Sequence, residues 1–278
     1  MQILLLGNGS RGGVLETVER LRPAIEKRAT IVAVDFTGLT DLSGTDADLA
    51  VVFGGDGSVL RAAHQMGIRQ KPVIAVHLGT LNFLATIRAE ELTALLDKPD
   101  LLRLSVTEHL MLSCSLSRKS DASGAEKILS ETVLNEVLVS GRSRERVLEL
   151  DLAIDGEWVT AYRADGLLVS TPIGSTAHNL SAGGPIIRKE TDAIVLSPIS
   201  PHTLSNRPLV DSPDRCYEIR VKQSAVLVLD GTEPVIIEPG DVILIRRSPY
   251  TFKMIDVPGY SYYRTLNNKL GWNRIGDR

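Results

Sequence analysis

The chain has little of what marks several common classes of protein. It has two cysteines in 278 residues, Cys114 and Cys216, too few for a disulfide framework or a zinc site. Its five histidines are scattered, with no pair at metal-ligand spacing on one helix. No apolar stretch is long enough to cross a bilayer, and residues 1–7 lack the basic leader and long apolar run of a signal peptide. We therefore expect a cytoplasmic protein with reduced thiols, no metal ligands of its own and no membrane partner.

Basic residues are not in excess either. Lys and Arg together number 31 against 34 Asp and Glu, which gives a formal charge of −3. Because a nucleic-acid-binding protein normally carries a basic surface, we expect no nucleic-acid partner. A hydrophobic content of 43% is enough for a sizeable core. A chain of 278 residues holds one large domain or two ordinary ones.

The first hundred residues alternate between short apolar runs and amphipathic segments. The apolar runs predict strands at 3–6, 31–34, 49–53 and 73–76. A helix is predicted over 14–28, and the residues expected on its buried face are Leu15, Val18, Leu21 and Ile25. Strands that are apolar throughout and separated by helices form parallel sheets covered on both faces. The N-terminal part is therefore predicted to be an α/β domain with a parallel sheet.

After about residue 101 the pattern changes to an alternation with period two. It predicts antiparallel strands at 147–154, 157–160, 218–222, 225–229, 235–237 and 242–245. Asp155-Gly156 and Asp230-Gly231 are hairpin turn signals, and the polar stretch 117–127 is predicted to be a mobile loop. A final helix is predicted over 264–272. We expect an α/β domain at 1–103, a β-rich, sandwich-like domain at 104–261, and a tail, 262–278, that packs back on the first domain.

The Gly-Gly-Asp-Gly turn at 54–57 is the most informative motif. It follows an apolar strand and precedes a predicted helix that starts at Ser58. Glycines let the backbone approach a bulky anion, and a helix N-terminus offers free N–H groups and a positive dipole end. Asp56 repels phosphate unless a cation or a proton-transfer role offsets the cost, which indicates phosphoryl transfer rather than nucleotide binding alone. The predicted phosphate-binding residues are Gly54, Gly55, Gly57 and Ser58.

A second glycine-rich turn competes with the first. Residues 7–12 fit the pattern G-x-G-x-x-G after a strand, and Asp35 closes the next strand as a ribose-binding acid would. Asp35 comes later than the usual distance of about 20 residues after such a motif, and Gly13 weakens the helix start. A dinucleotide site and a plain turn both remain open. In either case the turn is expected at the same sheet edge as 54–57, where it could contact phosphates.

Other segments select among the enzymes that share Gly-Gly-Asp-Gly, which include phosphofructokinases, lipid kinases and NAD kinases. Residues 165–185 closely resemble the long signature of NAD kinases. Residues 134–136, 197–208 and 269–272 resemble that family as well. The resemblance runs over nearly the whole chain in the expected order, and the long central signature is highly specific.

The resemblance implies an activity. The family transfers the γ-phosphoryl group of ATP to the 2′-hydroxyl of the adenosine ribose of NAD, which makes NADP. Asp56 aligns with the catalytic aspartate, and an ionised Asp56 within reach of the hydroxyl accepts its proton as a general base. Mg²⁺ is expected to be carried by the nucleotide phosphates. The family usually forms homodimers or homotetramers, in which a second subunit contributes to the site.

The resemblance also implies an NAD site between the two domains. Asn135 and Glu136 align with the pair that holds the nicotinamide-side ribose, and Asp165 aligns with an acid near the nicotinamide amide. Phe83 aligns with an aromatic residue that packs near the adenine. The other implied NAD contacts are Gly57, Thr176, Ala177, His178, Ser181 and Asp230.

Two positions depart from the family pattern. His178 stands where many members have Tyr, which exchanges a phenol for a ring that titrates near neutrality. Asn82 stands where many members have Gly. A lipid-type kinase and a dinucleotide sensor without turnover are the alternatives, and the choices between ATP and polyphosphate and between NAD and NADH stay open.

Overall fold

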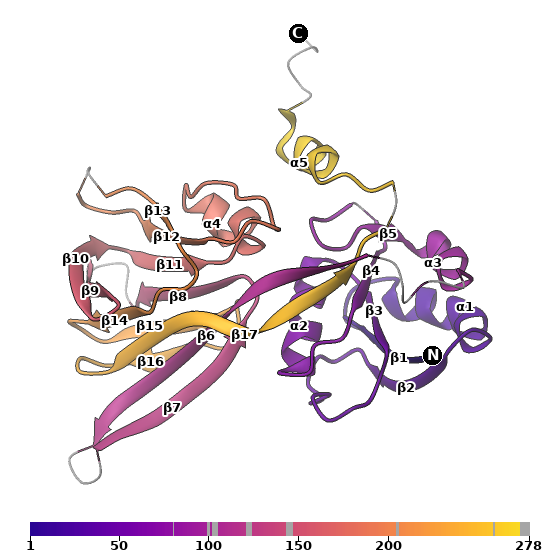
Figure 1. The fold of residues 1–278 in the computed structure, drawn as a ribbon, viewed down its shortest axis with the longest axis horizontal. Coiled ribbons are helices and arrows are strands. Elements are labelled where there is room, and N and C mark those ends of the chain that lie inside the picture. The colour runs from indigo at the N-terminus through magenta and orange to yellow at the C-terminus, as the bar shows by residue number, and fades with distance from the viewer. Residues whose placement is uncertain are drawn as a thin grey trace. The chain divides into compact units, whose positions relative to one another are not determined.

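The computed structural model describes residues 1–79, 81–98, 101, 105–120, 124–142, 147–203, 206–257 and 259–272. The chain forms two compact units. Unit 1 consists of Met1–Glu108 and Phe252–Arg278, and unit 2 consists of His109–Thr251. The chain passes from one unit to the other inside two long strands, β6 (Val106–Ser120) and β17 (Val242–Ile255), labelled in Figure 1. The expected boundary between residues 103 and 104 lies outside the described residues.

Unit 1 is built on a parallel sheet of order β2-β1-β3-β4. Its strands are β1 (Gln2–Gly7), β2 (Thr30–Asp35), β3 (Leu49–Phe53) and β4 (Val73–His77). Every residue of β3 and β4 is buried, as expected for strands that are covered on both faces. The free side of β4 pairs with β5 (Ile87–Arg88) and, through Met254 opposite Val73, with the end of β17. The predicted α/β domain with a parallel sheet is confirmed.

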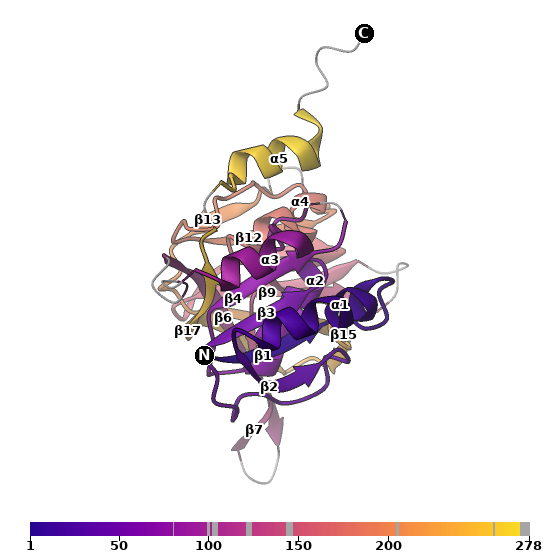
Figure 2. The same cartoon turned by 90° about the vertical axis from the view of Figure 1, so that its right-hand side faces the viewer.

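Helices cover both faces of this sheet. α1 (Val14–Glu26) and α3 (Ala89–Leu96) share one core cluster with the sheet, and the buried residues of α2 (Asp56–Met66) lie outside that cluster. Figures 1 and 2 show α1 and α3 on one face and α2 on the other. One prediction for α1 is wrong: Leu15 is 49% exposed, and the helix buries Val14 instead, which lies four residues before the buried Val18.

The C-terminal tail of unit 1 contains α5 (Tyr262–Leu270), which confirms the final helix with a shift of two residues at each end. Ser261 caps it by accepting a hydrogen bond from the N–H of Arg264. Just before the helix, the hydroxyl of Tyr260 donates to the carboxylate of Glu91 on α3. No helix in the described ranges has the length and apolar character needed to span a membrane.

Unit 2 is a sandwich of two antiparallel sheets. One sheet contains β10 (Glu157–Ala164), β9 (Leu148–Ile154), β14 (Tyr217–Val221) and the first part of β17, with β6 and β7 (Gly124–Val133) beside them. The other has the order β13 (Leu209–Asp211), β12 (Ile194–Ile199), β11 (Gly166–Ser170), β8 (Glu136–Gly141), β15 (Ala225–Leu229) and β16 (Val235–Ile237). Alternate residues of both sheets meet in one apolar core. The predicted sandwich is therefore confirmed.

The mobile loop predicted at 117–127 is wrong for its described residues. They belong to the β6–β7 hairpin, in which Ser117 pairs with Lys127 and Arg118 with Glu126. Residues 121–123 lie outside the described part of the chain. This end of the hairpin buries few apolar side chains, so its sequence is polar. Its strands form through backbone hydrogen bonds, which do not require apolar residues.

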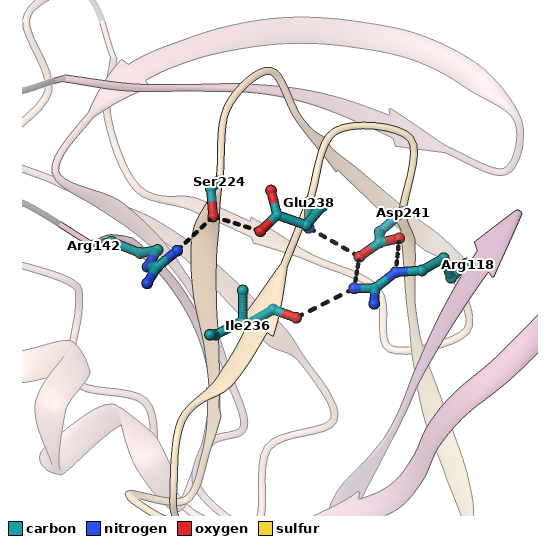
Figure 3. A network of polar contacts seen from close by, with 6 residues as sticks. All are labelled: Arg118, Arg142, Ser224, Ile236, Glu238 and Asp241. Carbon is teal, nitrogen blue, oxygen red and sulfur yellow. Dashed lines mark hydrogen bonds and ion pairs between the residues drawn. The ribbon is translucent and has the colours of Figure 1, made fainter.

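A polar network holds the described part of this hairpin to the β16–β17 turn (Figure 3). Arg118 makes a two-pronged contact with Asp241, with Nε 2.8 Å from Oδ1 and Nη2 2.6 Å from Oδ2. Asp241 is buried and also accepts the N–H of Glu238. Hydrogen bonding to Arg118 holds the pKa of the Asp241 carboxyl below its ordinary value. A charged arginine therefore satisfies this buried acid, and the network is structural.

Candidate active site

The Gly-Gly-Asp-Gly turn lies at the carboxyl edge of the parallel sheet of unit 1. β3 ends at Phe53, and α2 begins at Asp56 with Gly55 as its N-cap. Gly54 has a φ of 142°, and its N–H donates to the carbonyl of Val76. The N–H of Ser58 donates to the carbonyl of Gly55. Within the described residues, the N–H groups of Asp56 and Gly57 have no such acceptor, so these two are available to an anion.

The first and last glycines of the turn serve different purposes. A Cβ on Gly54 would lie 2.1 Å from Oγ of Ser58, in a backbone conformation that favours glycine. A Cβ on Gly57 would meet nothing within 4 Å. Gly54 is therefore required by the fold, whereas Gly57 leaves open space beside a free N–H group.

This difference predicts opposite results for two alanine variants. We expect Gly54→Ala to lower the free energy of unfolding by about 2–4 kcal/mol, through overpacking and backbone strain. Gly57→Ala keeps or raises stability, because alanine favours a helix by up to about 1 kcal/mol, but it weakens the binding of inorganic tripolyphosphate at this turn. Urea unfolding and tripolyphosphate titrations test the pair. Equal stability losses in both variants would contradict this assignment.

The carboxylate of Asp56 is held by backbone N–H groups from a distant loop. Oδ2 accepts the N–H of Phe83 at 3.2 Å, while Oδ1 accepts those of Leu84 at 2.8 Å and Ala85 at 3.3 Å. Each carboxylate oxygen offers about two acceptor positions. Oδ1 is therefore filled, and Oδ2 keeps one position for a further donor such as a hydroxyl. The structure thus brings Asp56 and Phe83 together within unit 1.

Asp35 does not have the ribose-binding role that the G-x-G-x-x-G pattern suggested. It is 5% exposed. Its carboxylate accepts hydrogen bonds from the backbone or side chains of Thr37, Gly38, Thr40 and Gln65. Burial alone would raise the pKa of Asp35, but the bonds from Thr40 and Thr37 outweigh it and hold the pKa well below the ordinary range. With its oxygens used in this way, Asp35 is not a ribose-binding acid.

In unit 2, the carboxylate of Asp230 holds the backbone of Asn135 and Glu136 by hydrogen bonds. Its Oδ1 accepts the N–H groups of Asn135 at 2.7 Å and Glu136 at 3.0 Å, and its Oδ2 accepts the N–H of Leu134 at 2.7 Å. The N–H of Asp230 donates in turn to the carbonyl of Glu136. The structure therefore brings Asp230, Asn135 and Glu136 together, and Asp230 positions the backbone of the other two.

Two buried acceptors in this cluster lack partners. Asn135 and Glu136 are each 8% exposed, and among the described residues neither Oδ1 of Asn135 nor Oε2 of Glu136 has a hydrogen-bond partner. Unpaired buried polar atoms are costly and rare, so they indicate a ligand that supplies donors. Hydroxyl groups of a sugar are suitable donors. Burial, and next the charge of Asp230, raise the pKa of Glu136 to about 7.

The shifted pKa of Glu136 predicts a pH dependence of stability. The folded chain keeps the Glu136 proton up to about pH 7, whereas the unfolded chain releases it near the ordinary value of 4.5. The stabilising contribution is thus complete below about pH 4.5 and is lost as the pH rises towards 7. Between pH 5 and pH 8, the unfolding free energy of the wild-type chain should fall by about 2–3 kcal/mol relative to Glu136→Gln. Urea titrations measure this, with exposed Glu157→Gln as control, and equal slopes in all three proteins would refute it.

The long signature segment forms a compact turn built on buried polar groups. The short helices η2 (Gly174–Thr176) and α4 (His178–Ser181) lie in it. Nδ2 of Asn179 donates to the carbonyls of Ser175 and Pro185, and Oγ of Ser197 donates to Oδ1 of Asn179 at 2.7 Å. Asn179, Ser175 and Ser197 are fully buried. These residues were missed from the sequence, although the motif contains two of them.

The predicted contact residues lie on the surface of this signature turn. His178 and Ser181 are exposed, and Thr176 and Ala177 are half-buried. The turn adjoins the Asn135 cluster, because the N–H of Thr171 donates to the carbonyl of Asn135 at 2.8 Å.

Asp165 lies apart from that cluster. It is exposed and directly precedes β11, whose Gly166 pairs with Ser140 of β8, whereas Glu136 pairs with Ser170 at the other end of β11. Five residues of strand span roughly 16 Å. Unit 2 therefore does not bring Asp165 together with Asn135, Glu136 and Asp230. Across the described ranges, no three His, Cys, Asp or Glu side chains are arranged to hold a metal ion.

Comparisons with known proteins agree with this arrangement. The family model described as ATP-NAD kinase N-terminal domain matches residues 16–99, and the ATP-NAD kinase C-terminal domain matches residues 134–257. An NAD kinase of Rhodopirellula baltica is 44% identical over 275 residues, which cover 98% of this chain and 87% of the relative. An NAD kinase of Cupriavidus pinatubonensis is 36% identical and covers 98% of this chain and 92% of its own length.

Two solved structures share the fold over nearly the whole chain. Yeast NADH kinase complexed with NADH has a TM-score of 0.84 at 25% identity, covering 100% of this chain and 89% of the other. An NAD kinase from Archaeoglobus fulgidus in complex with ATP has a TM-score of 0.78 at 25% identity, covering 98% and 99%. With both family domains matched in order and full-length relatives well above 30% identity, the chain belongs to the NAD kinase family.

Proposed function

We propose that this enzyme transfers the γ-phosphoryl group of ATP, as its Mg²⁺ complex, to the 2′-hydroxyl of the adenosine ribose of NAD. The observation that carries the proposal is the carboxylate of Asp56. Three backbone N–H groups orient it, one acceptor position remains on Oδ2, and the free N–H groups of Asp56 and Gly57 lie at the same turn. A kinase needs an acceptor for the proton of the attacking hydroxyl and hydrogen-bond donors for the transferred phosphate. The carboxylate of Asp56 and the N–H groups at this turn supply both.

The proposed step balances as follows. The 2′-oxygen forms a bond to the γ-phosphorus while the bond between that phosphorus and the β–γ bridging oxygen breaks. The electron pair of the broken bond stays on the bridging oxygen of ADP, and the hydroxyl proton moves to Oδ2 of Asp56. Mg²⁺ enters with the nucleotide as part of the substrate and spreads the phosphate charge. The N–H groups of Asp56 and Gly57 stabilise the charge on the transferred group.

The NAD side of the proposal rests on unit 2. Oδ1 of Asn135 and Oε2 of Glu136 are buried acceptors without partners, and the two hydroxyls of a ribose supply the donors that they lack. The proposed contacts from the signature turn are Thr176, Ala177, His178 and Ser181, with Phe83 at the adenine. Asp230 acts by holding the backbone of Asn135 and Glu136. The neighbours solved with NADH and with ATP support these two substrates.

We also propose a homodimer or homotetramer. Asp165 is exposed and roughly 16 Å of strand away from the Asn135 cluster, so a second subunit is the simplest way to bring such a residue to a ligand. Sedimentation velocity with and without NAD tests the oligomeric state.

The activity is tested by incubating the enzyme with NAD, ATP and Mg²⁺ and detecting NADP with an NADP-specific dehydrogenase. Parallel reactions replace NAD by NADH and ATP by polyphosphate, and a reaction with EDTA removes the metal. NADP formation that depends on all three components supports the proposal. Binding of NAD without product would favour a sensor instead, and phosphorylation of a diacylglycerol or a sphingoid base would favour a lipid kinase.

A further inference from the structure

The turn formed by residues 8–13 has no part in the activity proposed above, yet it lies beside the Gly-Gly-Asp-Gly turn. β1 and β3 are parallel neighbours, with Gly7 opposite Phe53, so the turns that follow them leave the sheet side by side. The N–H of Asn8 donates to the carbonyl of Phe53 at 3.3 Å. A Cβ on Gly7 would lie 2.5 Å from that carbonyl oxygen, so a glycine permits this close approach.

The backbone of this turn is held in place by its own hydrogen bonds. Oδ1 of Asn8 accepts the N–H and the hydroxyl of Ser10, and the carbonyl of Asn8 accepts the N–H of Arg11 at 3.1 Å. The carbonyl of Arg11 accepts the N–H of Val14, the first residue of α1. The backbone of Arg11 is therefore held in place at the sheet edge.

The guanidinium of Arg11 lies against Gly55. An ideal Cβ on Gly55 would be 2.6 Å from Nη1 of Arg11 and 3.6 Å from Nδ2 of Asn82. Unlike Gly54, Gly55 has an extended backbone that any residue adopts, with φ of −110°. A side chain at this position would therefore displace the guanidinium of Arg11 from where it lies.

Arg11 is exposed and forms no hydrogen bond or ion pair with the described residues. The nearby carboxylate of Asp56 already accepts three backbone N–H groups. The phosphate turn itself has no cation, because residues 54–60 contain no Lys or Arg. The next arginine along the helix, Arg61, packs with Cδ 2.8 Å from the Cβ position of Gly38. A polyphosphate at this turn therefore meets the carboxylate of Asp56 and the guanidinium of Arg11.

We propose that Arg11 binds the β- and γ-phosphates of the donor nucleotide, and that Gly55 lacks a side chain so that the guanidinium can reach them. This inference rests on the proposed function. A guanidinium forms two parallel hydrogen bonds to phosphate oxygens, and it offsets the charge of Asp56 beside the phosphates. Arg11 is thus a donor-binding residue outside the Gly-Gly-Asp-Gly motif.

The first test compares Arg11→Met and Arg11→Lys with Arg69→Met, which changes an exposed arginine three residues after the end of α2. Arg11→Met should lower kcat/KM for ATP by about 10- to 100-fold, as expected for the loss of hydrogen bonds to a charged group. It should leave the KM for NAD and the melting temperature unchanged. Arg11→Lys should recover part of the loss, and Arg69→Met should match the wild type. The inhibition constant of inorganic tripolyphosphate should rise in parallel with the ATP effect.

The second test uses Gly55→Ala, which the backbone accepts and whose methyl group displaces the guanidinium. It should reproduce the ATP defect of Arg11→Met. Because both changes remove the same contact, the double variant should be no worse than either single variant, whereas independent effects would multiply.

The outcomes separate this inference from the activity itself. If the wild-type enzyme makes no NADP, the proposed function fails. If the wild type is active and Arg11→Met keeps kcat/KM for ATP within twofold, the role of Arg11 is overturned. A multiplicative double variant, or an equal loss with respect to NAD and ATP, would also overturn it.

Discussion

The Asp56→Asn enzyme is expected to form NADP about 10²- to 10⁴-fold more slowly than the wild-type enzyme. The amide keeps the size and position of the carboxylate but cannot accept the proton of the 2′-hydroxyl. The structure adds a second effect. Three N–H donors, from Phe83, Leu84 and Ala85, would face an amide with one acceptor oxygen. We expect this mismatch to lower the free energy of unfolding by about 1–3 kcal/mol.

The two effects are separated by measuring turnover well below the melting temperature of the variant, together with NAD binding by calorimetry. NAD binding should persist, because the residues proposed to hold the nicotinamide-side ribose are in unit 2. Asp46→Asn is the matched control, since Asp46 is almost fully exposed on the same unit. Turnover of Asp56→Asn within threefold of the wild type would exclude Asp56 as the general base.

The Gly174→Ala variant is expected to lose about 3 kcal/mol of unfolding free energy. A Cβ on Gly174 would lie 2.2 Å from the carbonyl oxygen of Asn135 and 2.6 Å from Oγ of Ser170. That carbonyl cannot move away freely, because it accepts the N–H of Thr171. The methyl group therefore forces apart the signature turn and the strand end that carries Asn135 and Glu136.

Urea unfolding of Gly174→Ala measures the loss, and NAD titration of the folded fraction measures its effect on the binding residues. Gly44→Ala is the control, because a Cβ there meets nothing within 4 Å. We expect weakened NAD binding only in Gly174→Ala. A stability change below about 1 kcal/mol would mean that the signature turn adapts without loss.

The fold was predictable where the sequence carries a strong periodic signal. β3 and β4 are apolar throughout, and the sandwich strands alternate cleanly, so both architectures were recognised. Leu15 was placed on the wrong face of α1, because Leu15 and Val14 lie three and four residues before Val18 and both fit the spacing of a buried helix face. The β6–β7 hairpin was missed because its end carries few apolar side chains, and backbone pairing leaves no trace in composition.

The candidate site was predictable in its residue types more than in its contacts. The family resemblance pointed to Asp56 and Phe83, but the bond between them uses a backbone N–H 27 residues away, which no side-chain pattern reports. Asp230 stays a predicted NAD contact, and no side-chain pattern indicated that its carboxylate accepts the N–H groups of Leu134, Asn135 and Glu136. Asp35 matched a fingerprint, yet only the structure shows that its oxygens are already used.

The division of unit 1 between the two ends of the chain has a consequence for biosynthesis. The first residue of β4, Val73, gains its partner Met254 on one side only after 181 further residues have been made. At typical translation rates this takes roughly 10–40 s. During that time unit 2 is synthesised in full, while the first residue of β4 has no strand to pair with on the side that β17 later occupies. A newly made chain therefore carries an unpaired strand edge until β17 has been made, and the nascent protein is most exposed to misassembly there.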